Sequence, residues 1–445
     1  MLAGCSSEAA ITPPVGTPLL GPTRPSTGVH DGLYARALVL GDGDGTRVAL
    51  VTLDLIGLDF SLADEVRREV TRATGITFVL LNCSHTHSAP FTIPWSVTGY
   101  AWLQAEGRPW RDNLPGRVTQ AVSEAAAGLQ EAALSAGRAP AQIGLNRRLP
   151  RDGGVVMAPN PNGTVVPWVD VLRVDDARGR PMALLYSHAC HPVAVHAEST
   201  LISADFPAFA GQALRERLGS DVLPLFAQGC GASLNTDPLA GGFEAAERAG
   251  RKLGEAAVAA AEEAAPLPDA ALRMASLRLQ LPLADWPPLA ECDRGIAHLQ
   301  ARLAGAEDWS VRNTLLALRD LRERAARAEE QCLRFDLQGV RIGDEWCLVA
   351  MPHEVVADYQ LWAQAASPAP ATMVWGYTNG CESYVPTDAD LAQGGYEAAH
   401  YAFPDGAAEP VAGAALLYPY RRPLRAGADQ QIKAGIATLW RGLGL

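Results

Sequence analysis

Strand-like and helix-like patterns alternate along the first part of the chain. Residues 47–55 form an apolar run rich in β-branched side chains, which predicts a buried strand. Apolar positions recur at helical spacing among the charges of 62–74, which predicts an amphipathic helix, and 76–84 has the pattern of a second strand. Together the three segments predict a βαβ-like unit at the start of the fold.

The same alternation continues through the middle of the chain. We expect a helix over roughly 113–136, followed by strands that alternate with two more helices. The strands are expected near 169–174, 182–190 and 222–229, and the helices at 207–218 and 242–265. Strands that alternate with helices in this way predict an α/β fold in which both faces of the sheet are covered.

The pattern changes between about 284 and 333, where the chain is charged and helical without any strand signal. This stretch predicts an inserted helical hairpin, for which a solvated charged face is favoured over a partner site. Strand patterns resume over 333–352, with a turn at Gly343 and Asp344. Because strand patterns flank the insertion on both sides, we predict a single large α/β domain over 1–445, with mixed sheets flanked by helices.

Composition and charge narrow the classes of function. The 445 residues are 48% hydrophobic, as expected of a globular core, and carry a formal net charge of −12. Such an acidic chain argues against binding to nucleic acid or to an anionic membrane surface, which both attract clustered Lys and Arg. No apolar run approaches the ~20 residues of a membrane span, so we expect no stable membrane association. A small-molecule substrate is therefore expected, and the sequence indicates no oligomeric state.

The eight cysteines are scattered without a CxxC pair. This distribution favours a reducing compartment over a disulfide framework, so we expect a cytoplasmic protein. Four cysteines lie beside the polar segments described next, where small buried packing residues are the favoured interpretation: Cys83, Cys190, Cys230 and Cys381.

Histidines gather at the ends of three predicted strands. Six of the nine histidines and one glutamate occupy these positions: His85, His87, His188, His191, His196, His353 and Glu354. Any one of them, taken singly, is more often structural than a ligand. Loops at the carboxyl ends of strands form the ligand sites of open α/β sheets, and imidazole nitrogens and carboxylate oxygens are the ligands of zinc. The pattern therefore predicts a metal site at this edge of the sheet, although it contains no HExxH motif.

Several motifs resemble those of the neutral, non-lysosomal ceramidases and their bacterial relatives, which are zinc-dependent amide hydrolases. The resemblance extends over nearly the whole chain, and its order along the sequence agrees with the family. The motifs are "AAITPPVGTPLLG", "SHTHSAP", "NRR", "ACHPV", "SADFPAFA", "FAQGCGASLN", "MPHE" and "YTNGCESYVPTDADLAQGGYEAA".

The resemblance implies a role for each matching residue of the predicted metal site. His85, His191, Glu354 and Tyr384 correspond to the four zinc ligands of the family. His87 corresponds to a histidine that faces the substrate as an acid/base or transition-state group. On an extended backbone, residues two apart point the same way, so His85 and His87 are expected to converge on one reacting centre.

Further residues are implied near the substrate and behind the ligands. Tyr396 corresponds to a family tyrosine that contacts the substrate carbonyl. Arg147 corresponds to an arginine near the same place, although Arg148 is an alternative in register. Asp54 and Asp205 lie at further strand ends and are candidates to orient a ligand histidine through its other nitrogen.

The implied reaction is hydrolysis of an amide bond in an N-acyl compound by metal-activated water. A serine nucleophile is not expected, because Ser233 stands where the short relatives have an acidic residue and no GxSxG motif is present. Only about forty residues follow "YEAA", so we do not expect the C-terminal immunoglobulin-like domain of the ceramidases. Hydrolysis of an ester, a lactone or a non-lipid N-acyl compound on the same centre, and a non-catalytic metal-binding relative, remain alternatives.

Overall fold

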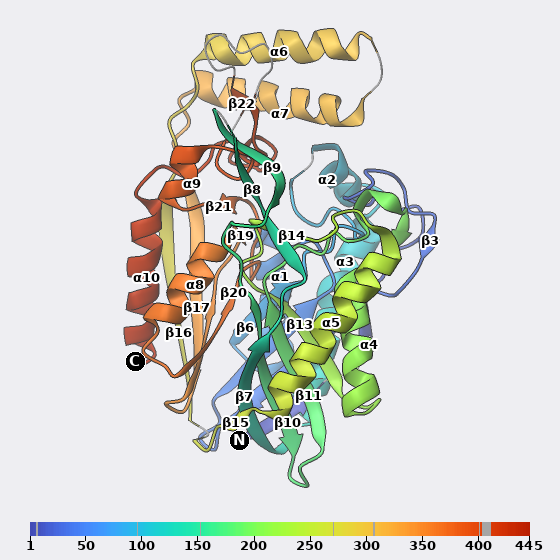
Figure 1. The fold of residues 1–445 in the computed structure, drawn as a ribbon, viewed down its shortest axis with the longest axis vertical. Helices are drawn as coiled ribbons and strands as arrows, with labels where there is room; N and C mark the ends of the chain where they lie inside the picture. Colours follow the sequence, from blue (N-terminus) through green and yellow to red (C-terminus); the bar gives the residue numbers. More distant parts are fainter. Residues whose placement is uncertain are drawn as a thin grey trace.

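Two β-sheets lie face to face at the centre of the molecule, with helices on the outer face of each (Figure 1). The computed structural model describes residues 1–5, 8–95, 97–151, 153–269, 271–305, 308–399, 401–402 and 411–445. The inner faces of both sheets contribute to one apolar cluster, which joins Leu38, Leu50 and Leu185 of the first sheet to Val340 and Leu348 of the second.

The first sheet has the main strand order β13-β11-β10-β7-β1-β4-β5-β6. These strands are β13 (Leu223–Gln228), β11 (Pro181–His188), β10 (Trp168–Asp176), β7 (Gln130–Pro140), β1 (Leu2–Cys5), β4 (Tyr34–Gly41), β5 (Arg47–Leu53) and β6 (Phe78–Cys83). Two short strands, β2 (Ala9–Ala10) and β15 (Ala265–Pro266), pair with β4 and β7. The predicted βαβ unit is confirmed, because β5 and β6 pair in parallel and α1 (Phe60–Thr74) connects them.

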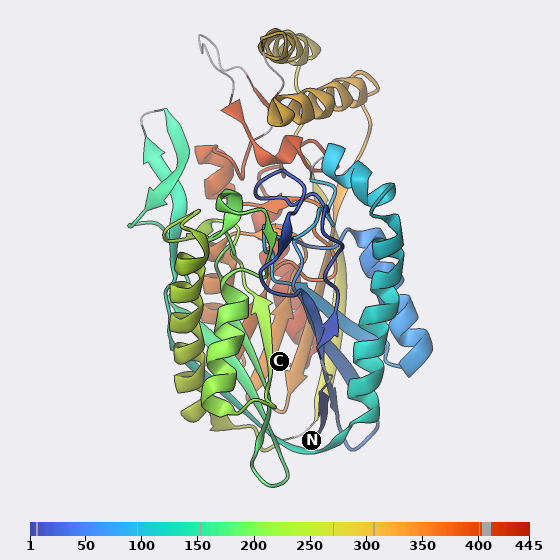
Figure 2. The same cartoon turned by 90° about the vertical axis from the view of Figure 1, so that its right-hand side faces the viewer.

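The second sheet has the order β16-β17-β18-β20 and contains the flanks of the predicted insertion. Its strands are β16 (Leu272–Pro282), β17 (Cys332–Ile342), β18 (Trp346–Ala350) and β20 (Ala371–Trp375). β16 and β17 pair antiparallel along their whole length, and the chain between them forms α6 (Leu289–Leu303) and α7 (Trp309–Ala326). The predicted helical hairpin is thus confirmed, and it stands at one end of the sandwich (Figures 1 and 2).

Helices cover the outer face of each sheet. On the first sheet, α1 and α3 (Arg108–Ala127) pack on β4, β5 and β6, while α4 (Phe206–Leu218) and α5 (Gly242–Glu262) pack on β7, β10, β11 and β13. On the second sheet the layer consists of α8 (Ala357–Ala366) and α10 (Ala428–Gly442). The predicted α/β class is confirmed. The difference is that helices cover only the outer face of each sheet, while the inner faces of the two sheets pack against each other.

The predicted helix over 113–136 is wrong in its second half. α3 ends at Ala127, and the following residues form β7, which pairs with β10. Small residues make 130–136 resemble a helix in sequence, but here they let α5 approach the strand closely. A Cβ added at Gly137 would lie only 2.1 Å from the carbonyl oxygen of Ala260 in α5. Tertiary packing therefore overrides helix propensity in this segment.

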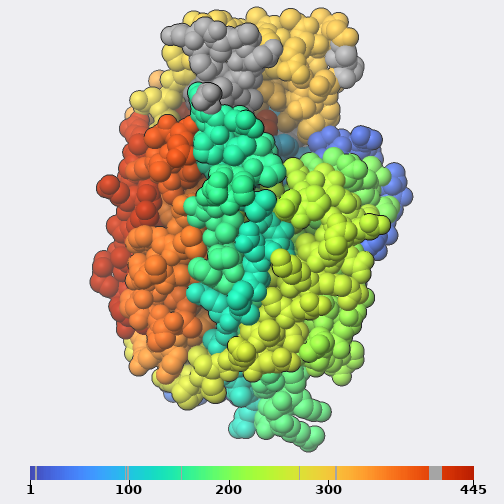
Figure 3. Space-filling model, in the orientation of Figure 1, coloured from blue at the N-terminus to red at the C-terminus, as the bar shows by residue number. Residues whose placement is uncertain are grey.

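Short elements surround the end of the sandwich nearest the insertion. They are β3 (Gly28–Val29), β8 (Gly144–Arg151), β9 (Gly154–Asn160), β12 (Leu201–Ile202), β14 (Leu234–Thr236), β19 (Glu354–Val355), β21 (Tyr384–Val385), β22 (Tyr401–Ala402), β23 (Val411–Ala412), α2 (Val97–Gln104), α9 (Asp388–Gln393), and the 3₁₀ turns η1 (His196–Glu198) and η2 (Ala414–Leu416). Figure 3 shows the segment from β7 to β9 on the surface, between the C-terminal part of the chain and α5.

Two other expectations concern the whole chain. All eight cysteines are free, and the four beside the polar segments are buried, as predicted. Within the described ranges, no helix combines the length and the apolar character needed to cross a bilayer.

Candidate active site

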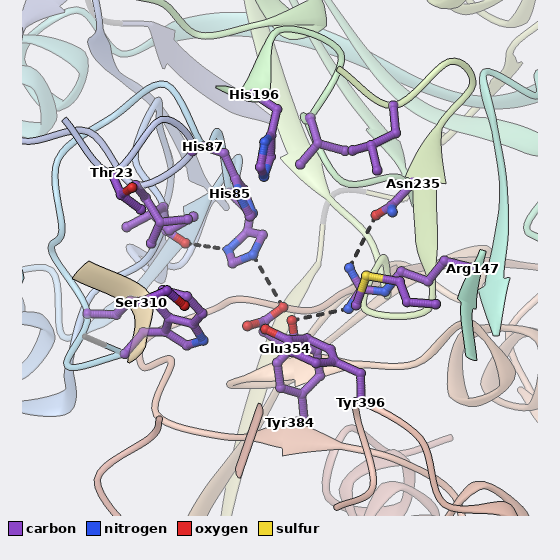
Figure 4. A pocket seen from close by; sticks show the side chains of 18 of the residues that line it. Thr23, His85, His87, Arg147, His196, Asn235, Ser310, Glu354, Tyr384 and Tyr396 are labelled. Carbon is purple, nitrogen blue, oxygen red and sulfur yellow. Dashed lines mark hydrogen bonds and ion pairs between the residues drawn. The ribbon is translucent and has the colours of Figure 1, made fainter. Parts of the chain in front are cut away.

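A cavity of about 320 Å³ lies where the ends of β6 and β11 meet the loops that follow β18 and β20 (Figure 4). Six of the seven predicted site residues line it: His85, His87, Arg147, Glu354, Tyr384 and Tyr396. The seventh, His191, is fully buried beside Glu354. The loops that the sequence places at strand ends are therefore brought together as expected.

His85 is held rigidly just beyond the end of β6. Its backbone has a φ of 69°, and its backbone N–H donates to the carbonyl oxygen of Leu55 over 2.9 Å. The ring Nδ1 donates to the carbonyl oxygen of Ile56 at 2.5 Å. Because His85 has a left-handed conformation, the expected extended backbone from His85 to His87 is wrong, although the two ring centres lie 5.2 Å apart.

His191 is fixed in the same way beyond the end of β11. Its Nδ1 donates to the carbonyl oxygens of Gly231 at 2.7 Å and Leu234 at 3.0 Å. Carbonyl oxygens only accept hydrogen bonds, so Nδ1 carries the ring proton and Nε2 presents a lone pair. Burial lowers the pKa of His191 to about 4, so the ring is neutral at pH 7.

Glu354 points one carboxylate oxygen at both rings. Its Oε2 lies 3.2 Å from Nε2 of His85 and 3.2 Å from Nε2 of His191. The hydroxyl of Tyr418 donates to the other oxygen, Oε1. Burial acts to raise the pKa of Glu354, but the neighbouring histidines outweigh burial and hold it well below its ordinary value.

These contacts make the group suitable for a cation. Since each Nδ1 donates its proton to a backbone carbonyl, the Nε2 atoms of both rings are directed at the same carboxylate oxygen. Two imidazole nitrogens and a carboxylate oxygen are ligands that suit a metal cation, and burial strengthens their attraction to its charge. Backbone carbonyls that fix the protonated nitrogen are also the usual outer partners of metal-bound histidines.

His87 completes a group of three imidazoles. One ring nitrogen from each of His85, His87 and His191 lies within 4.8 Å of the others, close enough for all three to hold one metal ion. The His87 ring centroid is 5.2 Å from that of His85 and 5.6 Å from that of His191. Both its ring nitrogens are buried without a hydrogen-bond partner among the described residues, and burial lowers its pKa. His87 is therefore available either to a metal or to a substrate.

Arg147 contacts both predicted tyrosines of the site, Tyr384 and Tyr396. Its Nη2 donates to the Tyr384 hydroxyl at 3.2 Å, and its Nη1 donates to Oδ1 of Asn235 at 3.2 Å. The guanidinium also lies 5.5 Å from the ring centre of Tyr396. Burial is the main cause that raises the pKa of Tyr384 well above its ordinary value, so without a metal its hydroxyl keeps its proton.

The structure decides between the two adjacent arginines. Arg147 lines the cavity, whereas Arg148 is directed to Asp390, with Nε 2.9 Å from Oδ1. Both arginines contact Glu397, through Nε of Arg147 at 2.8 Å and Nη1 of Arg148 at 2.7 Å. The pairing of β8 with β9 is irregular between Asn146 and Arg148, and a bulge of this kind lets two consecutive side chains reach the same partner.

Tyr396 reaches the cavity from a tight turn. Gly394 and Gly395 precede it with φ values of 72° and 91°, which glycine adopts without strain. The Tyr396 ring lies edge-on to Tyr384, with ring centres 5.7 Å apart. Both tyrosines therefore face the same cavity from different segments.

Other predicted residues lie outside the site. Asp54 accepts from Arg36 at 2.8 Å and Asp205 accepts from the backbone N–H of Val195 at 2.8 Å, so neither carboxylate orients a histidine. His188 hydrogen bonds to the Trp168 carbonyl at 2.8 Å, which is a structural contact.

Of three further polar residues considered in the sequence, His353, Ser233 and His196, only His196 lines the cavity. His353 hydrogen bonds to the Arg334 carbonyl at 2.8 Å and packs away from the cavity. Ser233 accepts from the backbone N–H of Ala357 at 3.2 Å, so its hydroxyl caps the start of α8. His196 lines the cavity, with its ring centre 5.3 Å from that of His87.

Sequence reasoning missed several residues of the site. Tyr418 donates to Glu354 and lies in none of the quoted motifs. Tyr377 packs against His85 with ring centres 4.4 Å apart, and it opens the motif "YTNGCESYVPTDADLAQGGYEAA", which was a usable signal. Glu397 directly follows Tyr396 in "YEAA", so its position in that motif was a usable signal. Trp309 comes from the insertion and had no signal at all.

Comparisons with known proteins agree with this architecture. No family profile and no curated protein sequence matches the chain. Solved ceramidase structures share its fold. A ceramidase complexed with C2 has a TM-score of 0.70 at 18% identity, over 94% of this chain and 73% of that one. The neutral ceramidase from Pseudomonas aeruginosa has a TM-score of 0.70 at 18% identity, over 99% of this chain and 74% of that one. The chain therefore has the neutral ceramidase fold, which confirms the resemblance predicted from its motifs.

Proposed function

We propose that this protein is a zinc-dependent hydrolase of the neutral ceramidase family that cleaves the amide bond of an N-acyl compound. The observation that carries the proposal is the convergence of the Nε2 atoms of His85 and His191 on one oxygen of Glu354, at 3.2 Å from each. His85, His191 and Glu354 supply the N and O ligands that zinc prefers, and Tyr384 is the proposed fourth ligand. When bound, zinc would polarise a carbonyl group and lower the pKa of water towards ~7.

Arg147 and Tyr396 are proposed to bind the carbonyl oxygen of the substrate. Both line the cavity, and the guanidinium is kept in place by Glu397 and Asn235. Hydrogen-bond donors held rigidly in a buried site stabilise the negative charge that develops on such an oxygen. The fixed pairing with Glu397 means that Arg147 needs little reorganisation during the reaction.

His87 is proposed to transfer the proton to the leaving amine. Its two ring nitrogens have no partner among the described residues, so either can approach a substrate nitrogen. Burial lowers its pKa, which makes the protonated ring a stronger acid than an exposed histidine. Because the resting ring is neutral, His87 would first accept a proton from the attacking water and then deliver it to the leaving nitrogen as the carbon–nitrogen bond breaks.

The proposed substrates are amides with a short or medium acyl chain, not ceramide in a membrane. The cavity of about 320 Å³ lies at the low end of the ~300–1,000 Å³ range of small-molecule sites. A metal-activated water does not by itself choose between amides and esters, so substrate class needs a direct comparison.

The proposal is tested with the purified protein and its metal content. We expect one equivalent of zinc by elemental analysis, and activity that a chelator abolishes and added zinc restores. A panel of N-acyl amines is compared with the matching esters and lactones, and with ceramide in vesicles, by kcat/KM. Faster turnover of the esters would replace the amide assignment, and a metal-free, inactive protein would indicate a non-catalytic relative.

A further inference from the structure

The helical insertion has a core of its own. An apolar cluster formed mainly by α6 and α7, with Cys292, Leu299, Leu315 and Leu318, is separate from the clusters of the sandwich. Trp309, the first residue of α7, is an exception. It packs against the main cluster of the second sheet and lines the catalytic cavity. The insertion therefore contributes a side chain to the active site.

Several contacts fix Trp309 in this position. Asp308 caps α7 by accepting from the backbone N–H of Val311 at 3.0 Å. One turn further along, Oδ1 of Asn313 accepts from the backbone N–H of Val97 at 2.8 Å, which joins α7 to the segment after the catalytic histidines. The Trp309 ring also packs against Phe91, with ring centres 6.1 Å apart. The start of α7 is thus tied to the body of the protein.

The two sides of the cavity differ in chemistry. Arg147 and Asn235 supply polar groups on one side, where Met157 and Leu239 also line the cavity, and Ser310, the neighbour of Trp309, lies across the cavity from Arg147 and Asn235 (Figure 4). Leu20 and Ile93, both nearly fully buried, line the cavity together with Trp309 and supply apolar surface. An amide that directs its oxygen to Arg147 and its nitrogen to His87 can lay its acyl chain on the apolar surface that Leu20, Ile93 and Trp309 form.

We propose that Trp309 forms the end of the acyl subsite and that its indole ring limits the length of the acyl chain. The inference rests on the proposed amide hydrolysis and adds the residue that sets its specificity. An indole fills a large volume with a rigid ring, and each methylene that finds no room loses its burial energy. Burial of one methylene is worth ~0.8 kcal/mol, or about fourfold in an equilibrium or rate ratio.

The test compares Trp309→Ala and Trp309→Phe with the unmodified protein. The substrates share one amine and carry straight acyl chains from acetyl to dodecanoyl. We expect the alanine variant to shift the optimum of kcat/KM to longer chains, with a relative gain of about fifteenfold for each two further methylenes that now fit. The phenylalanine variant, which keeps most of the packing, should give a smaller shift in the same direction.

Trp286→Ala is the matched control from the same insertion. Trp286 donates to the carbonyl oxygen of Glu329 at 3.0 Å and stacks 3.6 Å from the Arg422 guanidinium, but it does not line the cavity. Its removal should leave the chain-length profile unchanged. An equal shift in this control, or an unchanged profile in both Trp309 variants, would overturn the inference.

A binding measurement separates this inference from the proposed function. Straight-chain carboxylates from acetate to dodecanoate are the product class, and their affinities are measured by calorimetry on the zinc-loaded protein. If no amide is cleaved but the longest bound carboxylate is longer for Trp309→Ala, the reaction assignment fails and the role of Trp309 stands. If amides are cleaved but neither kcat/KM nor affinity depends on residue 309, the role of Trp309 fails alone.

Discussion

Glu354 and Tyr384 are directly paired residues on two adjacent parallel strands, β19 and β21. Side chains at paired positions leave a sheet on the same face, so the carboxylate and the phenol enter the cavity side by side. The two strands lie thirty residues apart in the sequence but are held together by their pairing. The position of the Tyr384 side chain therefore depends on that of Glu354.

Tyr384→Phe tests whether this neighbour is a ligand. The substitution removes one oxygen and keeps the ring, so we expect weaker zinc affinity in a protein that folds normally. Tyr359→Phe is the control, because Tyr359 is a fully buried tyrosine whose hydroxyl donates to the Pro386 carbonyl. Zinc titration against a chelator measures both variants. Equal affinity in Tyr384→Phe and the unmodified protein would make Tyr384 a neighbour of the metal and not a ligand.

Replacement of either histidine that faces Glu354 should remove the metal. His85→Ala and His191→Ala each delete an imidazole nitrogen, and we expect nearly complete loss of one zinc equivalent in both. His188→Asn is the control, since His188 is also buried, hydrogen bonds to the Trp168 carbonyl and does not line the cavity. Elemental analysis of the three proteins decides the matter, and retained zinc in both alanine variants would rule out the proposed centre.

Tyr396→Phe should separate catalysis from metal binding. The variant loses one hydrogen-bond donor but keeps the ring that packs beside Tyr384. Loss of such a donor typically lowers kcat by ~10²–10³, or roughly 3 to 4 kcal/mol, with little change in bound metal. Kinetics and zinc content are measured on the same preparation. Normal kcat with normal zinc would remove Tyr396 from the reaction.

Local periodicity was sufficient to predict most elements of the fold, but not the layers. In β4, Leu38 packs towards the second sheet while Val39 packs towards α1 and α3. Both faces of such a strand are apolar, and the pattern is the same whether a helix or a sheet covers it. The misassigned start of β7 has a similar origin, because small residues suit both a helix and a strand crossed closely by another element.

The strand-end positions of His85, His191 and Glu354 made the centre of the site predictable from sequence. Tyr418 was not predictable, because its loop approaches Glu354 only in the folded chain. Local pattern also could not choose between Arg147 and Arg148, which have the same chemistry. Only the folded structure distinguishes them, since Arg147 lines the cavity and Arg148 pairs with Asp390.

The two arginines should give different phenotypes when changed. Arg147→Lys shortens the donor group in the cavity, so we expect a fall of at least tenfold in kcat with a modest loss of stability. Arg148→Lys breaks contacts to Asp390 and Glu397 outside the cavity, so its main effect should be on the free energy of unfolding. Breaking a buried ion pair can cost about 3 to 5 kcal/mol. Steady-state kinetics and denaturant unfolding are measured on both variants. A large fall in kcat for Arg148→Lys with normal kcat for Arg147→Lys would contradict the prediction.

Protein stability should fall below neutral pH in a way that depends on His188. Burial lowers the pKa of this histidine from 6.5 to about 4. Between these two values the unfolded chain binds a proton that the folded protein does not, so the free energy of unfolding decreases as the pH falls. The contribution of one such group is about 1.4 kcal/mol per pH unit within that window.

Other buried groups titrate in the same range, so the measurement compares two proteins and not one. Burial raises the pKa of Asp205 to about 6, and this group acts in the opposite direction. Its contribution is common to the unmodified protein and to His188→Asn, whose amide can still donate to the Trp168 carbonyl. Denaturant unfolding from pH 7 to pH 4.5 should therefore give a shallower loss of stability in the variant. Parallel curves would show that His188 gains its proton equally easily in the folded and unfolded states.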